Sequence, residues 1–417
     1  MAQLSSDHFA FGPGLLSIEE ALARASANLK PIAEVESVSL VEADGRILAH
    51  DLIAGVDLPP FFNSAVDGYA VRHADLQPGG ETIMPITGRI AAGGEGAFSV
   101  PAGAAVRIFT GAPMPDGADT VFMQEDVRLD GNRVTLPTGL KPGANCRPAG
   151  EDLPRGQVAL TAGRRMTPET IALAAALGID RLTVRRPIRV AIFSTGDELV
   201  SPGQALPPSS LYDSNRFTLA ALVRRLGADV TDLGILKDNR EAVAAALAGA
   251  AADHDLILTS GGVSTGEEDH VKAAVEQEGS LAFWRLAIKP GRPVAMGVVG
   301  GTAFIGLPGN PVAVFITFAH VVRPFLTALA GGKPERPLAL PVRSGFAYRK
   351  KEGRREYVRV SLNRGADGVV EAHKHPREGA GVITSLTETD GLVELTEDIT
   401  RIEPGAIVGF LSYALLR

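Results

Sequence analysis

Three short loops, each directly after a compact apolar run, constrain the fold of this chain most strongly. The apolar runs span 189–193, 255–259 and 302–305, and their branched side chains do not alternate with polar ones. Such runs are typical of strands buried on both faces of a parallel sheet. The loops after them span 194–198, 260–266 and 306–311. Because a parallel sheet gathers its loops at the carboxyl ends of its strands, we expect the loops to form one site.

Strand and helix patterns alternate from residue 188 to residue 330. We expect strands near Val190, over 230–236 and over 256–259, and helices over 215–226, 240–251 and 268–276. Consecutive units of strand, helix and strand predict a doubly wound, mostly parallel sheet in a domain spanning 188–330.

The 417 residues exceed what one hydrophobic core usually spans, so we expect a multidomain α/β protein. Residues 56–152 are rich in Pro and Gly and contain short β-type runs, which predicts a β-rich insert domain. Residues 331–417 show short strands separated by turn signals, which predicts a C-terminal β-barrel or sandwich.

The two segments that flank the insert, 1–55 and 153–187, combine both kinds of pattern. Helical patterns cover 16–29, with Ser17 placed to cap, and 168–177, with Pro168 in its first turn. The pattern over 35–53 is strand-like. We assign both segments to one elongated, mixed α/β linker domain.

Composition excludes several classes of function. A formal net charge of −7 gives no basic face for general nucleic-acid binding. The single cysteine, Cys146, excludes an intrachain disulfide, so we expect a reducing cytoplasm. One cysteine also excludes a Cys-rich zinc site, and no His pair has the spacing of zinc ligands. The N-terminus lacks a secretory signal pattern. The apolar segment 312–330 contains His320 and Arg323, which favours a buried helix over a membrane span.

The glycines of the three loops let a ligand approach backbone N–H groups, and Pro311 leads into a helix whose N-terminus favours an anion. Each loop alone also fits an ordinary tight turn. Their occurrence in one alternating sheet favours a binding crevice, although no P-loop or dinucleotide-binding turn is present. We expect the ligand contacts from Ser194, Gly196, Ser260, Gly261, Gly262, Ser264, Gly306 and Pro308.

Acidic residues are frequent at the same predicted edge of the sheet. Carboxylates around a phosphate site suggest Mg²⁺, which binds through one or two carboxylates plus ligand phosphates. Each residue alone also fits a solvated loop acid or a helix cap. The group comprises Asp197, Glu198, Asp238, Glu267, Glu268 and Asp269.

Two further motifs carry polar groups on short turns. Residues 289–293 (KPGRP) place Lys289 and Arg292 on a loop stiffened by prolines, which suits a small oxyanion or an exposed surface turn. Residues 63–70 and 110–115 are polar, glycine-containing turns in the insert, where Asp67 fits an Asx-type turn. The cationic segment 349–355 is expected to be a solvated hairpin tip.

Read together, these segments resemble the molybdopterin molybdenumtransferase family, which includes the MoeA proteins and the gephyrin E domain. The resemblance covers essentially the whole chain. It rests on NSAVDGYAVR from Asn63, RIFTGAPMPDGAD from Arg107, GEDL from Gly150, FSTGDEL from Phe193, YDSNR from Tyr212, SGGVSTGEEDH from Ser260, FWRLAIKPGRP from Phe283 and GLPGNPV from Gly306.

The resemblance implies an elongated homodimer, with the active site between the sheet domain of one subunit and the insert of the other. It implies cleavage of adenylylated molybdopterin with release of AMP, and insertion of molybdate into the dithiolene in the presence of Mg²⁺. The molybdopterin adenylyltransferase and molybdoenzyme apoproteins are the implied partners, with no nucleic acid and no membrane.

The resemblance also assigns roles by motif position. Asp67, Thr110 and Asp152 would act from the insert side. On the sheet side, Glu198, Asp238 and Asp269 would hold metal or pyrophosphate. The molybdate pocket would comprise Lys289, Arg292, Pro293 and, from the C-terminal domain, Arg359.

The chain departs from the family pattern at Phe62, Val66, Ala313 and Ala380. Many members carry Asp and Met at the first two positions, and serine hydroxyls at the last two. A paralogue with weakened catalysis, acting as a molybdopterin-binding carrier or dimeric scaffold, is therefore the alternative function. A nucleotidyl transfer on molybdopterin fits the sheet domain alone and leaves the insert and the C-terminal domain unexplained.

Overall fold

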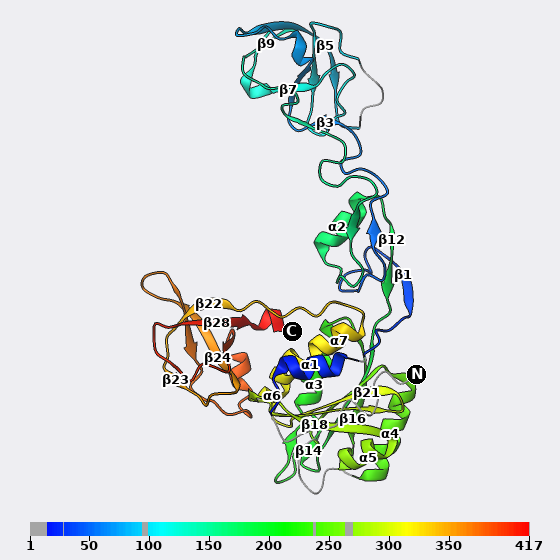
Figure 1. Cartoon of the computed structure of the whole chain (residues 1–417), viewed down its shortest axis with the longest axis vertical. Helices are drawn as coiled ribbons and strands as arrows, with labels where there is room; N and C mark the ends of the chain where they lie inside the picture. Colours follow the sequence, from blue (N-terminus) through cyan, green and yellow to red (C-terminus); the bar gives the residue numbers. More distant parts are fainter. Residues whose placement is uncertain (1–14, 28, 94–98, 237–238, 263–269, 417) are drawn as a thin grey trace.

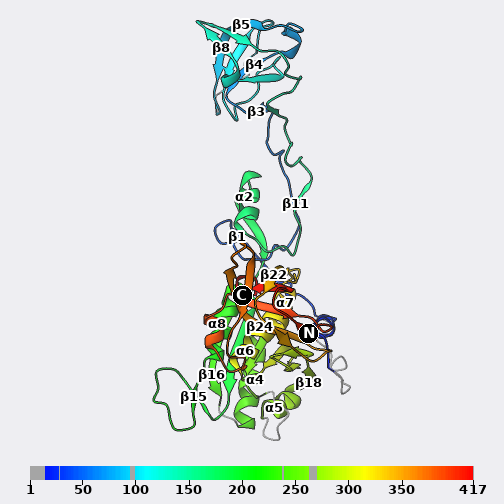
Figure 2. The same cartoon turned by 90° about the vertical axis from the view of Figure 1, so that its left-hand side faces the viewer.

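The computed structural model describes residues 15–27, 29–93, 99–236, 239–262 and 270–416. The chain is elongated, with the insert at one end and the central sheet at the other (Figure 1). The linker segments lie between them, and the C-terminal barrel lies beside the central sheet. Figure 2 shows the same separation from a second direction.

The central sheet has six strands, and its first four strands run parallel. In spatial order the strands are β16 (Asp229–Leu236), β13 (Arg189–Thr195), β17 (Leu256–Ser260), β21 (Thr302–Leu307), β20 (Pro293–Val299) and β18 (Gly279–Arg285). At the other edge, β20 pairs antiparallel with β21, and β18 pairs antiparallel with β20. The predicted mostly parallel, doubly wound sheet is thus confirmed.

Helices cover both faces of this sheet, which explains the absence of alternation in its strands. In β13, Ile192 packs toward the core that includes α3, while Phe193 packs toward the core that includes α4 and α5. Both side chains are fully buried. The helices are α3 (Asn215–Arg225), α4 (Arg240–Asp253), α5 (His270–Glu278), α6 (Pro311–Thr317) and α7 (Arg323–Leu329).

The segment Pro311–Leu329 is long and apolar enough to cross a membrane by length and composition alone. It forms α6, a π-helical turn (Phe318–Val322) and α7, and most of it is buried in the core of the central sheet. The structure thus agrees with the expected core helix.

The insert contains a six-stranded sheet with two small cores. Cys146 is half-buried there, and burial raises the pKa of its thiol to about 11, which makes it an inert group. In spatial order the strands are β7 (Thr120–Met123), β4 (Gly68–Val71), β6 (Ala105–Ile108), β5 (Thr82–Ile90), β9 (Arg133–Leu136) and β8 (Arg128–Asp130). At its base, β3 (Asn63–Ser64) pairs with β10 (Cys146–Arg147).

The two linker segments, which the insert separates in the sequence, pair directly with each other. The strand-like pattern over 35–53 is realised as two short strands separated by turns, because Gly45 and its neighbours bend the chain. The pairs are β1 (Val35–Ser39) with β12 (Arg181–Arg185), and β2 (Leu52–Ile53) with β11 (Val158–Leu160), beside α2 (Pro168–Ala176). Helix α1 (Ile18–Ser26), capped by Ser17, packs instead against the core that includes α7.

The C-terminal sheet closes into a barrel because β24 pairs with both β25 and β26. The short strand β19 (Ile288–Lys289), from the loop before β20, adds to β24 in parallel. The barrel strands are β24 (Arg355–Arg364), β25 (Val370–Lys374), β22 (Leu340–Ser344), β28 (Ile407–Ser412) and β26 (Gly391–Leu395).

The expectation of a fully solvated cationic hairpin at 349–355 is wrong at its end. Arg355 is buried and pairs with Glu19, Glu394 and Glu397, because strand β24 starts at this residue and carries it into the barrel. Charge runs do not reveal such partners, which lie far away in the sequence.

An ion pair fixes the start of β13 to the start of β17. The buried Asp255 accepts hydrogen bonds from Arg186 Nη1 (2.6 Å) and Nη2 (2.8 Å) and from the Arg189 backbone N–H (2.8 Å). Burial opposes the charge on Asp255, but these bonds outweigh it and hold the pKa of the carboxyl below its usual range.

Asp255→Asn is therefore expected to lower the free energy of unfolding at neutral pH by roughly 1.5–3 kcal/mol. A carboxyl whose folded-state pKa is depressed stabilises the fold above its unfolded-state pKa, and this contribution is lost as the pH falls through the folded-state value. The difference between wild type and variant should shrink in acid. Urea unfolding at several pH values measures it, with the exposed Asp229→Asn as control. An equal loss at all pH values would contradict the assignment.

Candidate functional site

The loops at the carboxyl ends of β13, β17 and β21 meet, as their positions in the sequence predict. Asn215, at the start of α3, donates from Nδ2 to Ser260 Oγ (2.8 Å) and to the Gly309 carbonyl (2.6 Å). Ser260 Oγ also lies 3.4 Å from the Pro308 carbonyl oxygen, to which it donates. One side chain thus connects the loop after β17 with the loop after β21.

The glycines of these loops are required by close backbone approach. Gly261 and Gly262 both have positive φ, of 89° and 64°. A Cβ on Gly261 would lie 2.7 Å from the Thr195 carbonyl oxygen, and one on Gly262 would lie 2.5 Å from Val271 Cγ2. The loop after β17 therefore packs against the end of β13 at distances that only glycine allows.

Buried hydroxyl and amide oxygens at this edge lack hydrogen-bond partners within the described part of the chain. They are Ser194 Oγ, Thr259 Oγ1 and Asn215 Oδ1. Ser194 and Thr259 are fully buried on the neighbouring strands β13 and β17. Ser194 lies on the sheet face of Ser260 and Asn215, whereas Thr259 pairs with Phe193 and lies on the opposite face. Since buried polar groups in folded proteins are nearly always paired, Ser194 Oγ and Asn215 Oδ1 indicate one place where a ligand or water completes the bonding.

The predicted acidic group is only partly within the described residues. Glu198 lies on the turn after β13, and its carboxylate packs over Gly196, where a Cβ would lie 2.5 Å from Oε2. Asp238, Asp269 and Ser264 lie outside the described residues, as do Glu267 and Glu268. Among the residues that are described, no three His, Cys, Asp or Glu side chains form a metal-binding group.

In the insert, the structure brings Asp67 and Thr110 together. Thr110 donates to Asp67 Oδ1 from both its backbone N–H and its hydroxyl, each at 2.8 Å. These two bonds hold the pKa of Asp67 below its usual range. Asp67 is therefore a fixed anion at neutral pH, and its Oδ2 accepts no hydrogen bond from the described residues.

Asp152 does not join this pair. It is exposed near the connection between insert and linker, where its backbone N–H donates to the Leu58 carbonyl (2.9 Å). The Asp67 turn itself belongs to the insert, at the opposite end of the chain from the loops around Ser260 (Figures 1 and 2). One copy of the chain therefore does not bring its two predicted halves of the site together.

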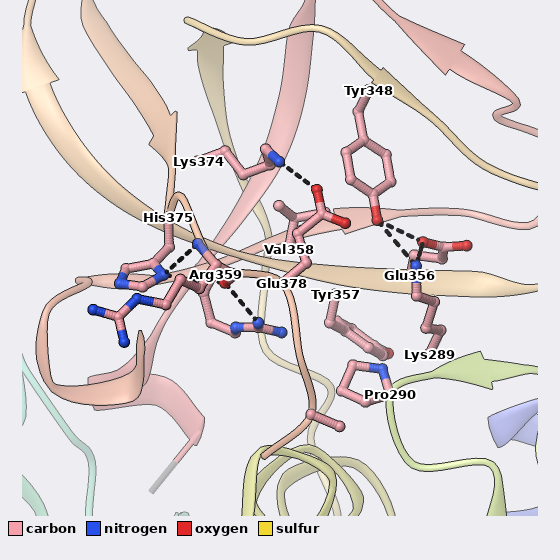
Figure 3. A pocket seen from close by; sticks show the side chains of 12 residues that line it. Lys289, Pro290, Tyr348, Glu356, Tyr357, Val358, Arg359, Lys374, His375 and Glu378 are labelled. Atoms are coloured by element: carbon pink, nitrogen blue, oxygen red, sulfur yellow. Dashed lines mark hydrogen bonds and ion pairs between the residues drawn. The ribbon is translucent and has the colours of Figure 1, made fainter. Parts of the chain in front are cut away.

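A second polar site lies between the barrel and the loop before β20. A cavity of about 120 Å³ is lined by Lys289 and Pro290 of this loop and by residues of the barrel (Figure 3). Ala380 also lines it, and its carbonyl accepts the backbone N–H of Val312 at the start of α6 (3.0 Å). The cavity thus adjoins the loop 306–311 that borders the crevice.

Arg359 is the most deeply buried cation of this cavity. It is 5% exposed, and burial lowers the pKa of its guanidinium. Its donors reach Ser385 Oγ (3.0 Å) and the carbonyls of Arg377 (3.2 Å) and Gly379 (3.3 Å), all of them neutral. No carboxylate of the described chain forms an ion pair with it, so an anion in the cavity would neutralise its charge.

The other cations of the cavity share it with two carboxylates. Lys289 Nζ lies 3.4 Å from Glu356 Oε2, which also accepts the Tyr348 hydroxyl (2.9 Å). Lys374 pairs with Glu378, and the two lysines both approach the Tyr348 ring. Burial and the bond to Glu356 raise the pKa of Tyr348, so its hydroxyl stays protonated and donates.

The sequence did not single out Tyr348, Glu356, Lys374 or Glu378. They reach the cavity through pairings in the barrel, and only the β-type pattern of that region was visible in the sequence. Arg292 and Pro293 do not line the cavity. Both are exposed, and the loop that carries them is held by Gly291, where a Cβ would lie 2.6 Å from Thr317 Oγ1.

Comparison with known families covers most of the chain. Residues 16–178 match the MoeA N-terminal region (domains I and II), residues 191–328 match a probable molybdopterin binding domain, and residues 341–413 match the MoeA C-terminal region (domain IV).

Individual relatives agree over nearly their full length. A protein of Haemophilus influenzae named molybdopterin molybdenumtransferase is 36% identical over 94% of this chain and 98% of its own. One of Nostoc with the same name is 38% identical over 89% and 87%. A crystal structure of the molybdopterin biosynthesis MoeA protein from Pyrococcus horikoshii superimposes with a TM-score of 0.80 at 28% identity, covering 96% of this chain and all of that one. The chain therefore belongs to the molybdopterin molybdenumtransferase (MoeA) family of enzymes, which serves molybdenum cofactor biosynthesis.

Proposed function

We propose that this chain is a molybdenum insertase, which cleaves adenylylated molybdopterin with release of AMP and inserts molybdate into the dithiolene. The observation that carries the proposal is Arg359, a buried guanidinium that has only neutral partners and lines a cavity with Lys289 and Lys374. A small tetrahedral dianion supplies the charge that this cavity lacks. Tungstate has nearly the same size and charge, so the same cavity suits it.

The crevice beside the cavity would hold the molybdopterin. The unpartnered oxygens of Ser194 and Asn215 offer bonds to a polar ligand, and the loop 306–311 connects crevice and cavity. Held in this way, the dithiolene would face the oxyanion while the phosphoanhydride extends toward the acidic edge of the sheet.

Glu198, Asp238 and Asp269 would hold Mg²⁺ at that edge, because hard oxygen ligands suit this ion. When bound, Mg²⁺ polarises a phosphoryl oxygen and lowers the barrier to hydrolysis. The part that this chain contributes from the insert is Asp67. With its pKa lowered, Asp67 is a weak base, so its free Oδ2 would orient a water or a cation rather than remove a proton.

The two halves of the site would come from two copies of the chain. The Asp67 turn lies far from the crevice of its own chain, so the insert of a second copy would supply it in a homodimer (Figure 1). Asp152, which lies outside the Asp67 pair, would contribute only in that assembly. Arg292 would act from the loop that also carries Lys289, although it does not line the cavity. We place the enzyme in the cytoplasm, where the adenylyltransferase would supply its substrate and apoenzymes would receive its product.

A carrier with weakened catalysis is the second candidate. It is favoured by Ala380, which lines the oxyanion cavity with a methyl group where relatives would place a hydroxyl. A missing hydroxyl donor weakens anion binding by about 0.5–1.5 kcal/mol. Arg359 and the two lysines remain, so we expect the loss to lower affinity and not to abolish turnover.

The deciding experiment is AMP release from adenylylated molybdopterin under anaerobic conditions with Mg²⁺, with and without molybdate. Release that depends on molybdate supports the insertase. A folded protein that binds molybdopterin without releasing AMP would instead support the carrier.

Lys289→Ala should raise the molybdate concentration needed for half-maximal AMP release by roughly tenfold or more, because a charge-assisted contact to the dianion is lost. The control is Lys351→Ala, a substitution of an exposed lysine that does not line the cavity. An unchanged molybdate requirement would remove Lys289 from the oxyanion pocket.

Thr110→Val should raise the pKa of Asp67 toward its ordinary value, because the hydroxyl bond to Oδ1 is lost while the backbone bond remains. Carboxyl ¹³C chemical shifts followed from pH 2 to pH 6 measure the change. Thr135→Val, in β9 of the same insert, provides the comparison. A titration of Asp67 that matches wild type would show that the hydroxyl bond does not control its charge.

Coexpression of Asp67→Ala and Lys289→Ala chains tests the shared site. Each homodimer carries a defect in both sites, whereas a mixed dimer has one site with both defects and one with neither. At a molybdate concentration that leaves both homodimers inactive, mixed dimers should recover about half of the wild-type activity per dimer. Mixed dimers as inactive as the homodimers would place both residues in a site formed by a single chain.

A further inference from the structure

Two arginines face each other on neighbouring strands of the insert sheet. Arg89 of β5 lies directly opposite Arg107 of β6, and Tyr69 of β4 lies opposite Arg107 on its other side. Residues directly opposite each other project from the same face of a sheet, so these three side chains form a row across the strands.

An aromatic ring lies against both guanidinium groups. The Cζ of Arg89 is 4.6 Å from the centroid of the Phe109 ring, and that of Arg107 is 4.8 Å away. Arg107 also lies 5.1 Å from the centroid of Tyr69. Stacking on aromatic faces holds a guanidinium in place while the donors at its edge stay available.

The row carries two positive charges, and no ion-pair partner of either lies among the residues that the structure describes. Like charges directly opposite each other destabilise a sheet. Arg107 donates to the Gly68 carbonyl (3.3 Å) and to Gln124 Oε1, both neutral, and Arg89 makes no hydrogen bond or ion pair with the described residues. One other arginine of the insert, Arg128, pairs with Glu81 at 2.5 Å. A bound anion would neutralise this repulsion.

The row lies next to the Asp67 and Thr110 pair, because the two groups are made of residues that are adjacent in the sequence. Thr110 directly follows Phe109, and Gly68, whose carbonyl binds Arg107, directly follows Asp67. The charge of Arg107 contributes to the low pKa of Asp67, after the two Thr110 bonds. An anion held by the arginines would therefore lie near the turn that carries Asp67.

We propose that Arg89 and Arg107 form an anion clamp that binds the phosphate of a nucleoside monophosphate group. The proposal rests on the insertase function, because it identifies the clamp with the adenylyl end of the substrate. Paired guanidiniums suit phosphate oxygens, and the exposed guanidinium of Arg89 offers a flat surface on which a base can stack. Molybdate has its own cavity at the barrel, at the other end of the chain.

Calorimetric titration of the full chain with AMP, and separately with inorganic pyrophosphate, tests the clamp in the presence of Mg²⁺. Arg89→Gln removes one guanidinium whose only described contact is the Phe109 ring, so this variant should fold normally. Arg107→Lys keeps the charge but loses the planar fork. The control is Arg133→Gln, an exposed arginine of β9 in the same insert.

We expect Arg89→Gln and Arg107→Lys each to raise the Kd for AMP by roughly tenfold. Arg133→Gln should match wild type. In the AMP-release assay, the clamp variants should show a raised KM for the adenylylated substrate with kcat largely retained, a split that a general folding defect would not produce.

Wild-type affinity for AMP in both clamp variants overturns the proposal, as does a wild-type protein that binds neither probe. Weakened binding of pyrophosphate with unchanged binding of AMP would overturn the nucleotide assignment. Failure of the insertase function is distinguishable from all of these. In that case the wild-type protein releases no AMP in the assay, yet its binding of AMP still depends on Arg89 and Arg107.

Discussion

The anion cavity depends on a two-residue strand that joins the central sheet to the barrel. Ile288 and Lys289 leave the antiparallel edge of the sheet and pair in parallel with Arg355 and Glu356, and the Arg355 N–H bonds to the Ala287 carbonyl (2.7 Å). Tyr357 of the same barrel strand stacks at 4.2 Å on His320, from the helical segment between α6 and α7. These contacts fix the barrel against the sheet, so Arg359 and Lys289 face one cavity although they lie 70 residues apart in the sequence.

Charge pairing distinguishes Arg359 from the two arginines that are equally buried. Arg216 is as buried as Arg359, yet it pairs with Asp213 and Asp232. Arg186 pairs with Asp255, and Arg355 has three carboxylate partners. Burying an unpaired charge costs far more than burying a paired one, and of the three most buried arginines, Arg216, Arg355 and Arg359, Arg359 is the one whose hydrogen-bond partners among the described residues are all neutral. This difference supports the proposed anion beside Arg359.

The central sheet was predictable because its signal is local. A strand buried on both faces, followed by a glycine-rich turn and a helix, is visible within about 30 residues of sequence. The convergence of Ser260, Pro308 and Gly309 follows from this topology alone. The cavity could not be predicted from the sequence in the same way. Tyr348, Lys374 and Glu378 come together through barrel pairings whose register depends on strands far apart in the chain. The burial of Arg355 is not visible in the sequence either, because its carboxylate partners also lie far away along the chain. Only the resemblance to a family pointed to Arg359.

The four departures from the family pattern lie in different parts of the elongated chain, so they affect different properties. Ala380 lines the cavity, where Arg359, Lys289 and Lys374 still supply positive charge, and Ala313 is buried in α6. Val66 is half-buried in a turn whose geometry is set by backbone bonds, with its carbonyl accepting the Ser64 hydroxyl (2.6 Å). Phe62 is 37% exposed beside Phe61 at the base of the insert. Exposed aromatic side chains are the kind that a protein–protein interface buries. Under the proposed function, the change at Phe62 would therefore bear on how two copies meet, whereas the changes at Ala313 and Ala380 would bear on how tightly the oxyanion is held.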